Sequence, residues 1–158
     1  MDIVVSYKDA EGNITEPLAH QEEYHLFTGW TKHHLMAGSL GTGKTEAMCI
    51  EAIQQCATYD NNIGLMGRKV LDAFKKSTLI QLLDIAGDFV KKHKSQDREI
   101  HFKNGSMIVY MALDDSRDSI QRIKSMNLGF FAFDQLEEVS EDTFMAAGGQ
   151  LRRKGKIG

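Results

Sequence analysis

Two kinds of apolar pattern alternate along the chain, and together they predict strands separated by helices. Short apolar runs at His33–Ala37, Ile63–Met66 and Leu128–Phe133 are typical of buried strands. The longer segments Lys44–Tyr59 and Val70–Val90 carry apolar residues at helical spacing, which predicts one helix in the first and one or two in the second. This alternation indicates an α/β fold with a mostly parallel sheet flanked by helices.

Shorter elements fill the remaining sequence. The β-branched run Asp2–Tyr7 predicts a first strand. Glu99–Phe102 and Met107–Met111 flank Asn104-Gly105, a dipeptide that predicts a β-hairpin inserted into the fold when it stands between apolar runs. Three further segments are expected to form short helices or helical turns: His20–Phe27, Ser119–Lys124 and Glu141–Leu151.

The composition indicates a soluble chain that forms one domain over residues 1–158. Of its 158 residues, 42% are apolar and 26% are charged, which argues against a disordered, collagen-like or disulfide-rich protein. The longest apolar run, Leu128–Phe133, is far too short to span a membrane. Cys49 and Cys56 show no metal-binding or redox spacing and fit a reducing cytoplasm.

The formal net charge of −3 hides an acidic start and a basic end. Residues 1–23 contain six acidic residues and one lysine, whereas the last seven residues contain four basic residues and no acid. One interpretation is that both termini are simply solvated. The other is that the basic end contacts phosphates, and charge alone does not choose between the two.

Residues 38 to 45 carry the strongest chemical signal in the chain. They match G-x-x-x-x-G-K-[ST] in full and stand between a predicted strand and a predicted helix. Glycines let backbone N–H groups turn toward phosphate oxygens, and the positive end of the helix dipole faces the same anion. Lys44 would place a cation on the β- and γ-phosphates, and Thr45 would give its hydroxyl to Mg²⁺. The residues expected to bind ATP here are Gly38, Ser39, Leu40, Gly41, Thr42, Gly43, Lys44 and Thr45.

A buried strand that ends in an acid is the expected partner of this loop. Leu128–Phe133 ends in Asp134, which would lie beside the phosphate loop at the carboxyl edge of the sheet. There Asp134 can hold Mg²⁺ together with Thr45. Hydrolysis also needs a group that orients and deprotonates water, and Gln135, Glu137 and Glu138 follow directly.

Several segments in this order resemble the ATPase part of the large terminase subunit of tailed phages, the DNA-packaging motor. The phosphate loop alone fits many unrelated proteins, but the ordered set covers roughly residues 16–154 and is much more specific. The segments that carry the resemblance are Glu16–Phe27, His33–Ala47, Ile63–Thr78, Ile100–Asp115, Arg122–Phe144 and Gly148–Gly155.

The resemblance implies an ASCE-type P-loop ATPase that uses ATP and Mg²⁺ to translocate double-stranded DNA into a procapsid. It implies that Gln21 contacts the adenine. It also implies a homo-oligomeric ring, with the portal protein and the small terminase subunit as partners and no membrane. The implied location is the host cytoplasm, transiently at the procapsid portal.

Two departures from the family pattern affect the catalytic residues. In the family an acid normally follows the aspartate that ends the Walker B strand, which corresponds to Asp134 here. This chain instead has Gln135, which can orient water but cannot take its proton. If a helical turn follows, Glu138 returns to the face of Gln135 and is the first candidate for the base, with Glu137 second. Many members also carry an arginine in the phosphate loop, where this chain has Leu40. Other arginines must then supply the transition-state cation, and the candidates are Arg68, Arg117, Arg122, Arg152 and Arg153.

Two other functions stay open at this stage. One is a nucleotide-binding module with little or no hydrolysis, in which Gln135 replaces the catalytic carboxylate and nothing takes over its role. The other is a different P-loop enzyme such as a nucleotide or small-molecule kinase, although the Asn104-Gly105 hairpin would be a poor lid. Only 24 residues follow Asp134, and they contain no acid cluster of the nuclease type. We therefore expect the N-terminal portion of a packaging ATPase, as a fragment, a split gene product or a degenerate copy.

Overall fold

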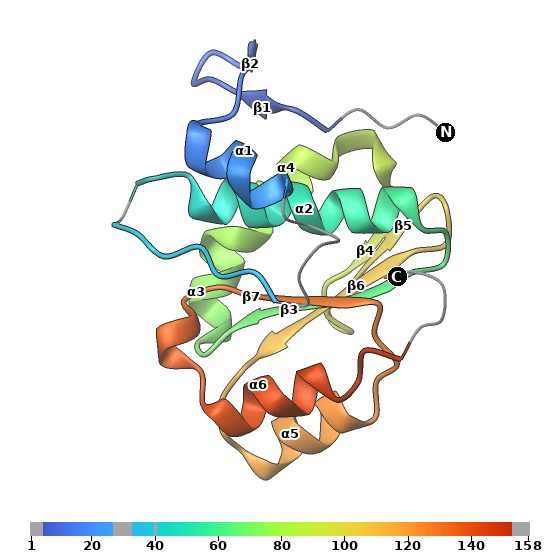
Figure 1. Cartoon of the computed structure of the whole chain (residues 1–158). Coiled ribbons are helices and arrows are strands. Elements are labelled where there is room, and N and C mark those ends of the chain that lie inside the picture. The colour runs from blue at the N-terminus through green and yellow to red at the C-terminus, as the bar shows by residue number, and fades with distance from the viewer. Residues whose placement is uncertain (1–4, 27–32, 40, 153–158) are drawn as a thin grey trace.

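A five-stranded sheet with helices on both faces forms the body of the molecule (Figure 1). The computed structural model describes residues 5–26, 33–39 and 41–152. The strand order in the sheet is β4-β5-β6-β3-β7. The strands are β3 (Ile63–Arg68), β4 (Val90–Lys94), β5 (Glu99–Phe102), β6 (Met107–Ala112) and β7 (Phe130–Phe133). The predicted α/β fold, with a sheet flanked by helices, is confirmed.

The strand β3 lies between β6 and β7 in the sheet and is parallel to both of them. Leu65 is paired with Val109 of β6 on one side and with Phe131 of β7 on the other. Leu65 and Met66 are fully buried and point to opposite faces, so each contributes to a different half of the core. A strand buried on both faces must be apolar throughout, which is why Ile63–Met66 was recognisable from sequence.

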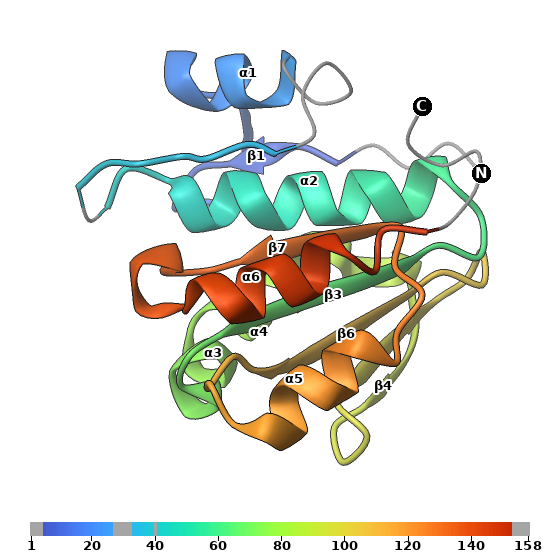
Figure 2. The same cartoon turned by 60° about the horizontal axis from the view of Figure 1, so that its bottom comes forward.

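Helices cover the two faces of the sheet as separate layers (Figure 2). One face carries α2, α3, α4 and the short 3₁₀ helix η1, which bury Cys49, Phe74 and Leu82 against Met66 and Tyr110. The opposite face carries α5 and α6, which bury Ile123 and Ala147 against Leu65 and Leu113. These helices are α2 (Lys44–Thr58), α3 (Leu71–Lys76), α4 (Thr78–Ala86), η1 (Gly87–Phe89), α5 (Arg117–Lys124) and α6 (Glu141–Gly148).

An N-terminal layer packs on the outer side of α2 (Figure 1). It consists of β1 (Tyr7–Lys8), β2 (Ile14–Thr15) and α1 (Ala19–Leu26). His25 joins the layer to α2, because one of its ring nitrogens lies 2.8 Å from the Tyr7 hydroxyl and the other 2.7 Å from a Glu51 carboxylate oxygen. Burial, and then the nearby Glu51 carboxylate, raises the pKa of Tyr24 in this layer to about 12.

Most predicted elements are present, with the Asn104-Gly105 turn joining β5 to β6 as an antiparallel hairpin. The prediction for Val70–Val90 is confirmed in its two-helix form, α3 and α4. The chain then enters β4 at Val90, an edge strand that the sequence did not indicate because Lys91 and Lys92 break any apolar alternation. Of the predicted strand Asp2–Tyr7, residues 1–4 lie outside the described residues.

The strand predicted at His33–Ala37 is not formed, and that prediction was wrong. The side chain of Leu35 is 72% exposed, so this run buries too little apolar surface to hold it in the sheet. Instead the ring of His33 packs against Phe131 and Phe144, with centroids 6.1 and 5.3 Å away. As a result β7 is an edge strand of the sheet that the structure describes. Among the described residues, the helices are too short or too polar to cross a lipid bilayer.

The close packing of β3 against β7 gives a first prediction. A Cβ added at Gly64 would overlap the Phe130 ring, so Gly64→Ala should lower the free energy of unfolding by about 1–3 kcal/mol in urea titration. Gly148→Ala is the matched control, because nothing lies within 4 Å of a Cβ at that helical position. Equal unfolding free energies in the two variants would contradict the described packing of β3 on β7.

Candidate functional site

The phosphate loop runs directly into the N-terminus of α2. Gly43 caps this helix in the left-handed conformation, with φ 75° and ψ 16°, which disfavours most side chains. Within the loop, the Thr42 hydroxyl donates to the Ser39 carbonyl at 3.0 Å. The helix is 15 residues long, so its free N–H groups and its dipole favour an anion at this end.

The ammonium group of Lys44 is held inside the loop. Its Nζ donates to the Gly38 carbonyl at 2.7 Å, to the Ser39 carbonyl, and to the Thr42 hydroxyl at 3.2 Å. These contacts direct a compact cation toward the space enclosed by the loop. A phosphate group bound in the loop would take the place of these oxygens as the acceptor for the three ammonium protons.

The helix α1 supports the loop from the N-terminal layer. Gln21 is 2% exposed, and its Nε2 donates to the Gly43 carbonyl at 3.0 Å while its Oε1 accepts from the Leu18 N–H at 2.8 Å. His20 Nε2 lies 2.7 Å from the Thr42 carbonyl oxygen. The amide of Gln21 therefore fixes the loop backbone, and its contact with adenine stays a prediction.

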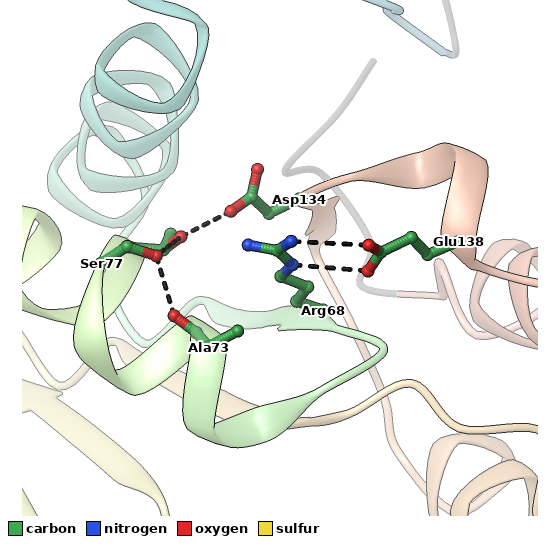
Figure 3. A network of polar contacts seen from close by, with 6 residues as sticks. Arg68, Ala73, Ser77, Asp134 and Glu138 are labelled. Carbon is green, nitrogen blue, oxygen red and sulfur yellow. Dashed lines mark hydrogen bonds and ion pairs between the residues drawn. The ribbon is translucent and has the colours of Figure 1, made fainter. Parts of the chain in front are cut away.

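Asp134 follows β7 and is fixed by two contacts. Its N–H donates to the Gly67 carbonyl at 2.9 Å, which continues the pairing of β7 with β3. Its Oδ2 accepts from the Thr78 hydroxyl at 2.6 Å, so one carboxylate oxygen is oriented by α4 (Figure 3). Burial, and then the negative charge of Asp134, raises the pKa of the neighbouring Cys49 thiol, which makes this cysteine a neutral core residue.

A sharp turn after Asp134 positions the acidic residues that follow. Gln135 is left-handed, with φ 54° and ψ 57°, and the short 3₁₀ helix η2 (Leu136–Glu138) comes next. Glu138 then faces Arg68 at the end of β3, and the guanidinium donates through Nε at 3.4 Å and Nη2 at 3.5 Å (Figure 3). The helical turn expected after Asp134 is therefore present. It places the Glu138 carboxylate against the Arg68 guanidinium.

A cleft of about 1950 Å³ joins the loop to the end of β7. This volume exceeds the roughly 300–1,000 Å³ of ordinary ligand pockets, so a nucleotide would fill only part of it. Glu138 is not among its lining residues, whereas Glu137 is. Leu40 lies outside the described residues. The predicted residues that line the cleft are Gly38, Ser39, Gly41, Thr42, Gly43, Lys44, Thr45, Asp134 and Glu137.

The oxygen donors of the cleft fit Mg²⁺. The Thr45 hydroxyl and the Asp134 carboxylate are hard ligands, and both line the cleft beside the phosphate loop. Magnesium usually takes one or two protein oxygens together with water and substrate phosphates, so this pair is a sufficient protein contribution.

The candidate arginines occupy different parts of the molecule. Arg68 lies beside the acidic turn after β7 (Figure 3). Arg117 and Arg122 belong to α5 on the opposite face of the sheet. Arg152 donates to the Gly149 carbonyl at 3.1 Å, and Arg153 lies outside the described residues. Among these candidates that the structure describes, Arg68 is the one beside the acidic turn, where it is paired with Glu138, and it is not among the residues that line the cleft.

Thr78 is a site residue that sequence reasoning missed. It stands 56 positions before Asp134, and no local pattern connects the two residues. Thr78 lies inside the segment Val70–Val90 that is predicted to be helical, and helical periodicity carries no indication of its spatial partner.

Comparison with known proteins points to one family. The family described as phage terminase large subunit matches residues 31–157. No curated protein matches the sequence. The fold is similar to the large terminase from a thermophilic bacteriophage, with a TM-score of 0.69 and 20% identity over 89% of this chain.

Two nucleotide complexes of the same phage terminase also share the fold. The ADP complex has a TM-score of 0.64 and 22% identity, and covers 87% of this chain and 36% of its own. The ATP-gamma-S complex has a TM-score of 0.62 and 19% identity, and covers 87% of this chain and 35% of its own. The chain thus spans little more than a third of these terminases, with 37% of the first one covered.

The support of the loop by Gln21 can be tested by mutation. Gln21→Ala would remove the two hydrogen bonds that the buried Gln21 amide makes to the Gly43 carbonyl and the Leu18 N–H. At about 0.5–1.5 kcal/mol for each bond, this should lower the free energy of unfolding by about 1–3 kcal/mol. Glu23→Ala, at an exposed position of the same helix, is the control and should change it by less than about 0.5 kcal/mol. Indistinguishable urea unfolding curves for the two variants would show that Gln21 does not hold the loop.

Proposed function

Because the chain belongs to the phage terminase large subunit family, we propose that it is the ATP-binding and hydrolysing motor module of a viral DNA-packaging terminase. In this role it would couple ATP hydrolysis to translocation of double-stranded DNA into a procapsid. The observation that carries the proposal is the convergence of Lys44, Thr45 and Asp134 on one cleft. Its partners would be other copies of the chain in a ring, the portal protein and the small terminase subunit, in the host cytoplasm.

Nucleotide binding would rest on the loop and on the end of β7. The loop N–H groups and Lys44 would hold the phosphates, and Thr45 and Asp134 would hold Mg²⁺. When bound, Mg²⁺ supplies positive charge to the phosphate oxygens. For Gln21 to contact the adenine, its buried amide would have to exchange its bonds to Gly43 and Leu18 for the base, since Gln21 does not line the cleft in this structure.

Water activation is assigned to the acidic turn, with Glu138 first and Glu137 second. Glu138 follows Gln135 by three residues and has its carboxylate oriented by Arg68. Glu137 lines the cleft itself. Arg68, which lies between this turn and Asp134 in Figure 3, is the cation proposed to stabilise the charge of the transferring phosphoryl group.

A second function is favoured by the same turn. Gln135 cannot accept a proton, and the Glu138 carboxylate faces Arg68 in the structure. A chain with this arrangement would bind nucleotide and hydrolyse it little, so that ATP would serve assembly only.

ATP turnover with and without duplex DNA separates the two functions. A motor module should hydrolyse ATP faster when DNA is added, whereas a binding module should bind ATP and show no turnover. Lys44→Ala is the control for the site and should weaken Mg-ATP binding by about 10–100-fold, because a charged contact worth roughly 1.5–3 kcal/mol is lost. Unchanged Mg-ATP affinity in Lys44→Ala, or phosphorylation of a small acceptor by the wild type, would refute the proposal.

Two single variants assign the base. Glu138→Gln should keep ATP binding and reduce turnover about 100-fold, since a general base contributes roughly 10²–10⁴-fold. Glu137→Gln is the matched control and should retain most of the turnover. The reverse result would move the role to Glu137, and normal turnover in both variants would remove this turn from catalysis.

A further inference from the structure

The buried residue Thr78 makes a short contact with the carboxylate at the end of β7. It is the first residue of α4 and has no exposed surface. Its hydroxyl donates to Asp134 Oδ2 at 2.6 Å, the distance typical of a hydrogen bond to an ionised carboxylate. Such bonds are about twice as strong as those between neutral groups, so the contact determines how this carboxylate is oriented.

Three structural elements meet at Thr78. Its hydroxyl binds the end of β7, and its carbonyl oxygen lies 3.8 Å from Cys49 Sγ on α2, the helix that begins at the phosphate loop. The neighbouring Ser77 hydroxyl donates to the Ala73 carbonyl at 2.8 Å and so serves its own helix turn (Figure 3). Ser77 Oγ also lies 3.4 Å from Thr78 Oγ1, but the Ser77 proton goes to Ala73 and the Thr78 proton goes to Asp134. Thr78 therefore ties Asp134 to the two helices beside it, and Ser77 makes no direct contact with the carboxylate that the structure records.

The contact occupies only one of the two carboxylate oxygens. Figure 3 shows the other oxygen of Asp134 directed away from the bonded one. Asp134 lines the cleft together with Lys44 and Thr45, so an oriented carboxylate can present this second oxygen to a ligand held by the loop. Without the Thr78 hydroxyl, Asp134 would have to lose side-chain freedom at the moment of binding.

We propose that Thr78 is a positioning residue that orients Asp134 for Mg²⁺. The proposal rests on the proposed nucleotide-binding function and adds a residue to it. Groups that hydrogen-bond a metal-binding side chain typically change metal affinity or activity by about 10–100-fold when they are removed. A merely structural threonine would affect stability and leave the magnesium dependence of nucleotide binding unchanged.

The test measures binding of fluorescent ADP as a function of Mg²⁺ concentration. Thr78→Val keeps the shape and removes the hydroxyl, and it should raise the Mg²⁺ concentration at half-maximal enhancement about 10-fold. Nucleotide affinity in EDTA should stay within about 2-fold of wild type, because the loop contacts remain. Thr78→Ser should restore the wild-type midpoint. Ser77→Ala is the control and should leave the midpoint unchanged.

The outcomes distinguish failure of the inference from failure of the function. If wild type binds ADP with magnesium enhancement and Thr78→Val has the same midpoint, the positioning role is wrong while nucleotide binding stands. If wild type binds no nucleotide or shows no magnesium enhancement, both are wrong. If thermal melting shows that Thr78→Val is unfolded, Thr78→Ala is compared with Thr78→Ser, and equal midpoints would overturn the positioning role.

Discussion

The pairing of β3 with strands on both sides is the constraint on which the site depends. The Arg68 carbonyl accepts from the Leu113 N–H at 2.9 Å, and the Gly67 carbonyl accepts from the Asp134 N–H at 2.9 Å. The carboxyl ends of β6, β3 and β7 therefore meet at one edge of the sheet. In open α/β sheets ligands bind at this edge, since the loops that leave parallel strands converge there. A shift of β7 along β3 would separate Asp134 from Arg68 and Thr78.

The polar contacts at this edge differ in strength, and the difference has consequences. The side chains of the Arg68–Glu138 pair are 23% and 37% exposed, with distances of 3.4 and 3.5 Å. An ion pair of this kind contributes about 0–1 kcal/mol, so it can be broken at little cost when a phosphate group arrives. The Thr78–Asp134 bond is short, and its donor is buried. The Asp134 carboxylate is thus held firmly by Thr78, while the Glu138 carboxylate can exchange Arg68 for another partner.

Gln135 joins these two carboxylates through an unusual backbone conformation. Its left-handed φ of 54° costs about 1–2 kcal/mol for a residue with a side chain. Because of this turn, Asp134 can accept a hydrogen bond from Thr78 of α4, and Glu138, four residues further on, can face Arg68. Strain of this kind concentrates at functional sites, where the surrounding packing fixes it.

The features that could be predicted from sequence are local, and those that were missed depend on distant partners. The buried strand at Ile63–Met66, the helix at Lys44–Tyr59 and the hairpin at Asn104-Gly105 follow from periodicity and turn chemistry, and the structure confirms them. The edge strand β4 was missed because edge strands tolerate lysines and need no apolar face. The strand expected at His33–Ala37 had the right composition but buries little. In the site, motifs predicted the phosphate loop and Asp134, whereas the contacts of Thr78 and Arg68 span 56 and 70 positions and are set by the stacking of whole elements.

A crystal structure of the protein with Mg²⁺ and ATP-gamma-S would test the site most directly. The terminal phosphate should lie within about 3 Å of Lys44 Nζ. The free oxygen of Asp134 should face the metal while Oδ2 keeps its bond to Thr78. A nucleotide bound away from the loop, or an Asp134 carboxylate turned away from the metal, would contradict the proposed arrangement.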